Sequence, residues 1–272
     1  MTSSAAPGAP DLAAAPQAPI APVRRERRSV GSYVFMPIFL ALVCAGLYLY
    51  VSNQELDTIE QRALNAGNIT AALLEHLRLT AISTVLVILI AIPLGVLLTR
   101  PFTGSYRGVL LTLANIGQAV PTIGLLALMG VGALSFIDID IGVTAAIIAL
   151  VAYAVLPVLR NTMVGLQQVD ESILEAGRGM GIGKFGVLSR IELPLSVPII
   201  LAGVRTALVI NVGTATLAAY INAGGLGRII VAGLSTNRIT VQITGALLTA
   251  VLALLIDYLA GIAEDVLRPK GL

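Results

Sequence analysis

Hydrophobic residues occur in long runs along this chain, and most polar and charged residues lie between the runs. The runs cover about 33–51, 78–99, 108–133, 142–164, 195–220 and 240–266. Each is close to or longer than the ~20 residues that a helix needs to cross ~30 Å of hydrocarbon. The pattern therefore predicts an all-α membrane protein with six transmembrane helices, with internal breaks at Pro121 in the third run and Gly213 in the fifth.

The composition supports a membrane protein and argues against other classes. The chain is 57% hydrophobic and 12% charged, whereas soluble domains carry about 25% charged residues. A net charge of +2 gives no electrostatic footprint for nucleic acid. One Cys and one His exclude an internal disulfide framework and a metal site built from cysteines or histidines.

The chain divides into four predicted segments. Residues 1–32, rich in Ala and Pro and ending in four arginines, are expected to be a disordered basic tail. The second segment, 33–75, contains the first helix, whose apolar run is longer than the 7–15 residues typical of a signal peptide, and an outer segment. Residues 76–267 form the transmembrane core, with a long cytoplasmic loop at 166–195, and 268–272 form a C-terminal tail.

The positions of Lys and Arg predict the orientation. They concentrate in the N-terminal cluster, at Arg100 and Arg107, at Arg160, in the loop 166–195 and in the C-terminal tail, and they are sparse in the alternate loops. Cytoplasmic loops of membrane proteins carry such an excess. Both termini are therefore expected in the cytoplasm.

The loop 166–195 contains a spaced motif. Apolar residues at helical spacing, a Gly-rich break and a second helical pattern that stops at Pro194 predict a short helix, a tight turn and another short helix. The segment resembles the EAA motif of ABC importer membrane subunits, E-A-A-x3-G-x9-I-x-L-P, with Gly in place of the third motif residue. The matching residues are Glu175, Ala176, Gly177, Gly181, Ile191, Leu193 and Pro194.

A narrower resemblance begins near His76 and covers most of the remaining chain. Stretches such as NIGQAVPTIGLLAL and RIELPLSVPIILAGVRTA are similar to permeases that import glycine betaine, choline or carnitine. The resemblance implies the type I ABC importer transmembrane fold in a bacterial plasma membrane. It also implies three partners: ABC ATPase subunits, an extracytoplasmic solute-binding protein, and a second permease copy, identical or paralogous.

The same resemblance implies that the loop is a coupling helix that docks on the ATPase. Apolar Leu174, Met180, Ile182 and Phe185 are then expected to enter a groove of the partner, with Glu175 as a charged anchor. The alternative is an amphipathic helix that lies on the membrane surface.

A nucleotide site on this chain is not indicated. The match to G-x-G-x-x-G at 181–186 lacks the strand that a dinucleotide-binding unit needs, and Gly183-Lys184 is not followed by Ser or Thr as in a P-loop. We therefore expect a non-catalytic transport subunit that binds no cofactor or metal, with ATP and Mg on a partner ATPase.

Polar residues within the third run indicate a transport path. Asn115, Gln118 and Thr122 fall on one helix face, and Pro121 frees a backbone carbonyl nearby. Polar groups beside a helix break at membrane depth are tolerated where they line a cavity. Hydrogen bonding between helices is the alternative.

Arg205 and Asp257 are ionisable residues deep inside two predicted helices. From the helix rise, they lie about 15 Å and about 10 Å from the same membrane face. Lone charges at this depth are costly, so we expect an ion pair between the fifth and sixth helices, favouring a structural role over substrate contact.

Two questions stay open from the sequence. The glycine-rich stretch 222–227 is either an outer gate or docking surface, or a flexible turn that leads into a short helix. The solute class rests on resemblance, because no Trp is present and no aromatic cage for a quaternary amine is evident. A permease for another solute such as an amino acid, a stand-alone secondary transporter and an intramembrane enzyme are the alternatives, the last two disfavoured.

Overall fold

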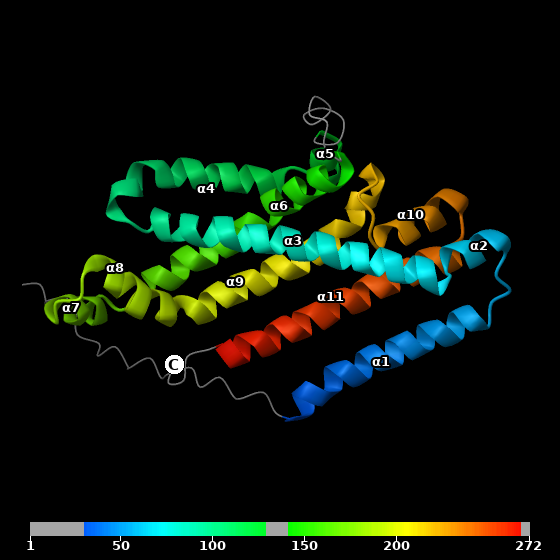
Figure 1. The fold of residues 1–272 in the computed structure, drawn as a ribbon, viewed down its shortest axis with the longest axis horizontal. Coiled ribbons are helices and arrows are strands. Elements are labelled where there is room, and N and C mark those ends of the chain that lie inside the picture. The colour runs from blue at the N-terminus through cyan, green and yellow to red at the C-terminus, as the bar shows by residue number, and fades with distance from the viewer. Residues whose placement is uncertain (1–29, 129–140, 268–272) are drawn as a thin grey trace, which may run out of the picture.

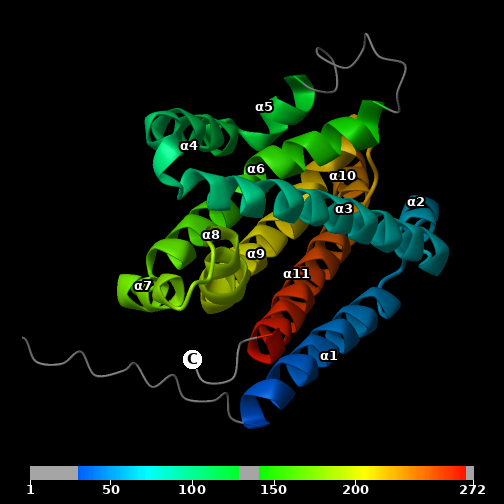
Figure 2. The same ribbon diagram turned by 60° about the vertical axis from the view of Figure 1, so that its left-hand side comes forward.

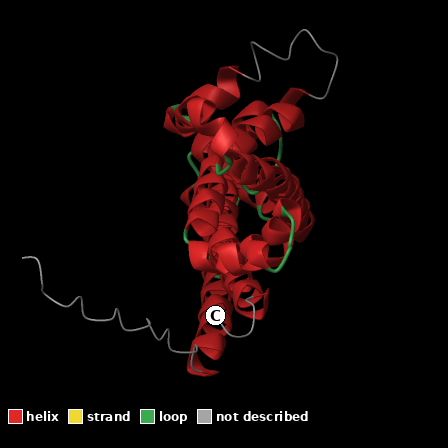
Figure 3. Ribbon diagram, turned by 90° about the vertical axis from the view of Figure 1, so that its left-hand side faces the viewer, coloured by secondary structure: helices red, strands yellow, loops and turns green. Residues whose placement is uncertain are grey.

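The computed structural model describes residues 30–128 and 141–267, and the regular elements in these two ranges are helices (Figure 3). The elements are α1 (Val30–Ser52), α2 (Thr58–Ala63), α3 (Ala66–Leu98), η1 (Pro101–Thr103), α4 (Gly104–Ala119), α5 (Thr122–Ala127), α6 (Ile141–Gln167), α7 (Glu171–Gly179), α8 (Lys184–Val187), η3 (Leu188–Glu192), α9 (Leu193–Thr214), η4 (Ala215–Ile221), α10 (Gly227–Thr236) and α11 (Ile239–Leu267). The predictions for the tails at 1–29 and 268–272 lie outside the described residues.

Five helices in the described ranges are long and apolar enough to cross a membrane. They correspond to five of the six predicted runs. The third run is the exception, because the chain is extended at Val120 and Pro121 divides the run into α4 and α5. The all-α membrane fold is therefore confirmed, and the count of six is met approximately; residues 129–133 of the third run are not described.

The long helices lie side by side, and α3 crosses in front of α6 and α9 (Figures 1 and 2). Helices α7 and α8 lie at one end of the bundle, together with the start of α1 and the end of α11. Helices α2 and α10 lie at the opposite end. We call these the α7 end and the α10 end.

Small side chains allow the central helices to approach closely. Helix α6 packs most extensively with α9 and α3, and its residues Ala146, Ala149 and Ala154 are fully buried. On α9, a Cβ added at Gly203 would lie 2.6 Å from Cβ of Asn161. Apolar contact with lipid is as favourable as apolar contact between helices, so such close packing is a main source of helix association in a membrane.

Buried polar contacts join the middle of α3 to the C-terminal end of α9. The Asn211 side chain, fully buried on α9, donates hydrogen bonds of 3.1 Å to the hydroxyls of Ser83 and Thr84 on α3. About two turns away on α3, Nε2 of His76 lies 3.0 Å from the carbonyl of Val212. These contacts hold the two helices in one register.

Two predicted boundaries differ from the structure. Helix α3 begins at Ala66, so the expected domain boundary at residue 76 falls inside a helix. The helical pattern also does not stop at Pro194, because α9 begins at Leu193 and continues from a π-helical turn. Proline cannot donate a backbone hydrogen bond. The wider π-helical turn before Pro194 is closed by a bond from Leu193 N–H to the carbonyl of Leu188, so the helix continues through the proline.

The glycine contacts yield a stability prediction. Gly203→Ala should lower the free energy of unfolding by about 1–3 kcal/mol, because the added methyl group overpacks the α6–α9 contact. Gly213→Ala, on the same helix with nothing within 4 Å of the added Cβ, is the matched control. Thermal unfolding of the detergent-solubilised protein measures both, and equal midpoints for the two variants would contradict the packing argument.

Candidate functional site

Helix α7 is closed at both ends by local hydrogen bonds. Asp170 caps the start by accepting from Ser172 N–H at 2.9 Å, and the bonds from Ser172 lower the pKa of Asp170 below its usual value. The carboxylate is therefore ionised at neutral pH, and the cap is lost only as the pH falls through this lowered pKa.

A Schellman motif ends the helix at Gly181, whose φ is +82°. Gly181 N–H donates to the carbonyl of Arg178 at 2.9 Å, and Ile182 N–H donates to the carbonyl of Gly177 at 3.1 Å. The left-handed conformation explains why the motif needs glycine at this position. The predicted helix–turn–helix is present.

The structure brings two motif residues together across this turn. A Cβ at Gly177 would lie 2.7 Å from Cδ1 of Ile191, so the small residue lets α7 fold back onto η3. Leu193 and Pro194 begin α9 and are half-buried, whereas Glu175 and Ala176 lie exposed on α7.

The tip of the turn carries exposed apolar side chains. Met180 is 74% exposed and Phe185 is 81% exposed, with the exposed Lys184 between them in sequence. Leu174, which we expected to enter a partner, is instead buried inside the segment at 7% exposed. The surface offered outward is therefore apolar at its tip and charged on its α7 side.

An ion pair that the sequence analysis missed fixes the exit from this segment. Glu192, the variable position of I-x-L-P, accepts from Nη2 of Arg100 at 2.5 Å and from Nη1 at 3.4 Å. Its side chain is 7% exposed. The available signal was that Glu192 is the only acidic residue between Glu175 and Asp257.

The expected path residues do not share one open face. Asn115 is exposed on α4 and accepts from Nη2 of Arg160 at 2.6 Å, and Gln118 donates to the carbonyl of Tyr153 at 3.4 Å. Thr122 is buried on α5, beyond the break at exposed Pro121. Both interpretations of this region stay open, because Gln118 and Asn115 bond to α6 while Asn115 is also accessible.

Arg160 on α6 adds a guanidinium to this region. The sequence places it among the cations of the cytoplasmic side, and α6 extends seven residues beyond it to Gln167.

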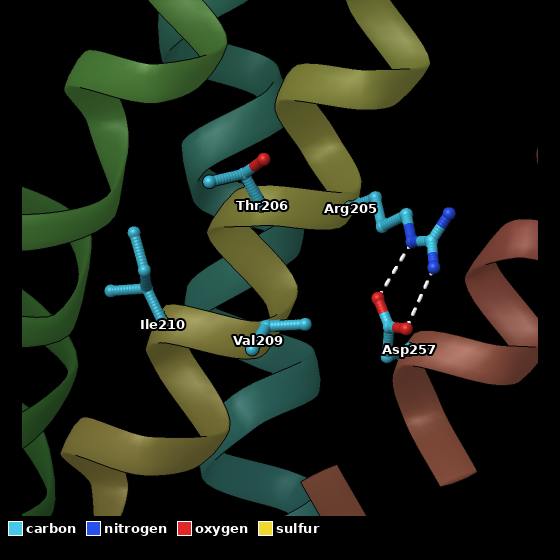
Figure 4. Close-up of a pocket in the computed structure, with 5 residues that line it drawn as sticks. All are labelled: Arg205, Thr206, Val209, Ile210 and Asp257. Atoms are coloured by element: carbon cyan, nitrogen blue, oxygen red, sulfur yellow. Dashed lines mark hydrogen bonds and ion pairs between the residues drawn. The ribbon is translucent and has the colours of Figure 1, made fainter. Parts of the chain in front are cut away.

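Arg205 and Asp257 lie in contact between α9 and α11 (Figure 4). Nε and Nη2 of Arg205 donate to the two carboxylate oxygens of Asp257 at 2.6 and 2.7 Å. Glu264, two turns further along α11, lies 3.7 Å from Nη1 of the same arginine. The pair borders an open pocket of about 250 Å³, which Thr206, Val209 and Ile210 also line.

At the α10 end, α3 holds the glycine-rich stretch. Gly225 N–H donates to Glu75 at 3.0 Å, and Leu226 N–H donates to Nδ1 of His76 at 3.3 Å. Because the carbonyl of Val212 can only accept, the proton of His76 lies on Nε2. Gly224 and Gly225 have φ of +90° and +85°, so the stretch is a defined turn and not regular helix.

Comparisons with known proteins all match membrane components of transport systems. Residues 91–270 match the family described as "Binding-protein-dependent transport system inner membrane component". The chain is 40% identical to the glycine betaine/carnitine/choline transport system permease protein OpuCB of Bacillus subtilis, over 76% of this chain and 92% of that protein. It is 38% identical to the osmoprotectant import permease protein OsmW of Salmonella typhimurium, over 80% of this chain and all of that protein.

A solved structure shares the fold. A chain of the inward-facing MetNI methionine ABC transporter superposes with a TM-score of 0.65 and 27% identity, over 74% of this chain and 96% of that chain. The transmembrane fold is therefore that of the type I ABC importers.

The bidentate contact yields a charge-swap prediction. Arg205→Asp or Asp257→Arg alone places like charges together between two helices, so each should lower the yield of folded protein and its thermal midpoint. The double swap should restore both. Size-exclusion profiles and thermal unfolding measure the effect, and a double variant no better than either single one would contradict a pairwise role.

Proposed function

The chain belongs to the family of inner membrane components of binding-protein-dependent transport systems, and on this premise we propose that it is the permease subunit of an ABC importer for a compatible solute. The solute class is a quaternary amine such as glycine betaine, choline or carnitine. The observation that carries this proposal is the folded EAA segment, in a chain 40% identical to a permease of that substrate range. An amino-acid permease is the weaker candidate, since the methionine transporter chain is 27% identical.

The segment α7–α8 docks on a separate ATPase in this proposal. Its apolar residues Leu174 and Val187 are buried within the segment, so they are not available for contact with lipid. The exposed Met180 and Phe185 have the character of interface anchors, and Glu175 adds a charge beside them. These features favour a protein partner over a membrane surface.

The orientation follows from the same segment. Cationic residues at the α7 end are Arg100, Arg107, Arg178, Lys184 and Arg190. The excess supports a cytoplasmic α7 end in a multi-pass inner membrane protein, with both termini inside. The glycine-rich turn at the α10 end then faces the binding protein.

Transport proceeds by alternating access in this scheme. The binding protein delivers the solute at the α10 end, and ATP binding closes the motor and moves α7–α8. Hydrolysis resets the cavity inward. ATP and Mg bind on the ATPase, this chain holds no cofactor, and a second permease copy completes the path. The polar region around Asn115 and Gln118 contributes to that path, and the Arg205–Asp257 pair braces α9 against α11.

Reconstitution tests the proposed function. The chain is co-expressed with an ATPase and a binding protein encoded beside it, purified as a complex and inserted into liposomes. Glycine betaine, choline or carnitine should stimulate ATP hydrolysis and accumulate inside, and methionine should do neither. A chain that does not co-purify with the ATPase, or a complex that no quaternary amine stimulates, would contradict the proposal.

Docking is tested by Phe185→Ala. Because Phe185 is exposed and packs little within this chain, its removal should leave thermal stability unchanged but weaken ATPase co-purification about tenfold or more, as for an interface hot spot. Phe102→Ala is the matched control, since Phe102 is 72% exposed and lies outside the segment. Equal ATPase recovery from both variants would argue against docking at this tip.

A further inference from the structure

The partly buried ion pair between Arg100 and Glu192 connects elements that the chain itself does not join at this point. Arg100 follows the end of α3, and Glu192 is the last residue of the π-helical turn that leads from α8 into α9. The two residues are 92 positions apart in sequence. The contact therefore attaches the exit of the coupling segment sideways to a different helix.

Both partners are fixed in place. Nε of Arg100 also donates to the carbonyl of Val96 at 3.2 Å, which ties the guanidinium to the last turn of α3. On the other side, Ser196 donates to the backbone carbonyl of Glu192 at 2.7 Å. A fork-shaped guanidinium on a carboxylate has one favoured geometry, so the contact transmits displacement better than an exposed pair would.

The end of α3 is in turn packed tightly on α6. A Cβ at Gly95 would lie 2.7 Å from the Thr162 side chain and 3.3 Å from the carbonyl of Leu159. Helix α6 continues through a short connection into α7. The path from α6 through α7, α8, the ion pair and α3 back to α6 is therefore a closed ring.

Helix α3 also reaches the opposite end of the protein. Its 33 residues span about 50 Å, and about a third of the way along it Glu75 and His76 bind the backbone of Gly225 and Leu226. Helix α3 (Figure 1), with the arginine that follows it, thus contacts the coupling segment just before α9 and the glycine-rich turn that follows η4.

We propose that the Arg100–Glu192 pair is a positioning pair that relays movement of α7–α8 into α3, and through α3 to the glycine-rich turn at the α10 end. The relay acts in addition to the covalent route through α9. It rests on the proposed function, because the movement comes from the ATPase.

The test separates coupling from folding. Removing one partner would strand a buried charge, so both are replaced in Arg100→Met/Glu192→Met. The reconstituted complex should assemble and hydrolyse ATP, but solute imported per ATP should fall by about fivefold or more, the lower range of measured couplings between sites. The charge swap Arg100→Glu/Glu192→Arg should restore most of the ratio.

A matched control removes another ion pair between elements. Arg238 and Asp57 lie 2.6 Å apart at the α10 end, and Arg238→Gln/Asp57→Asn should leave the ratio at its wild-type value. If the Met pair does not assemble, Arg100→Lys keeps both charges but loses the fork geometry, and it should lower the ratio in an assembled complex.

A second measurement follows the far end directly. Ala223, 5% exposed in the glycine-rich turn, is replaced by Cys in a Cys44→Ala background and labelled with a water-soluble maleimide. A non-hydrolysable ATP analogue should change the labelling rate in the otherwise wild-type complex and not in the Met pair.

The outcomes are distinguishable. A wild-type ratio and a wild-type labelling response in the Met pair or in Arg100→Lys would overturn the relay while leaving the proposed function intact. A wild-type complex that no solute stimulates would overturn the proposed function and the relay together.

Discussion

Polar groups inside a lipid-embedded bundle must find their partners within the protein, and most of this structure's specific contacts follow from that constraint. Helix α3 supplies many of the partners. It contacts Glu192 through Arg100 at one end, Asn211 through two hydroxyls at mid-length, and the glycine-rich turn through Glu75 and His76. Each contact joins α3 to α9 or to a segment that flanks α9.

Apolar packing lets the helices approach closely but does little to fix their register, because an apolar surface is as stable against lipid as against a neighbouring helix. The fully buried alanines of α6 and the contact of Gly203 with Asn161 bring α6 and α9 together. The polar contacts then select the register. Asn211 shows this division, since its amide reaches Ser83 and Thr84 only when the helices stand at one height.

The helices could be predicted from the sequence because a span is a local property of about twenty consecutive residues. The break at Pro121 and the turn at Gly181 were also predictable, since proline and left-handed glycine act locally. The pairing of Arg205 with Asp257 could be anticipated from depth alone, because only two ionisable residues stood that far inside predicted helices.

The remaining contacts had no such signal. Glu192 occupied a variable motif position and Arg100 was interpreted as a topological cation, and nothing in either neighbourhood indicates the other. Glu75 and His76 bind backbone N–H groups 150 residues away, and every residue except proline has such a group. Arg160 lies inside the predicted run 142–164, but nothing near it in sequence indicates its hydrogen bond to Asn115, 45 positions away.

These contacts decide how α9 can move. Helix α9 begins at the coupling segment and is followed by η4, which leads into the glycine-rich turn. A single helix attached to a motor at one end can tilt, and a tilt moves its far end in a direction that depends on how its sides are held. Helix α3 and the residue that follows it contact the chain just before α9, near the end of α9 and in the turn after η4, so these contacts oppose tilting of α9 relative to α3. In the proposed relay, displacement of α7–α8 would therefore move α3 and α9 together, and the glycine-rich turn with them.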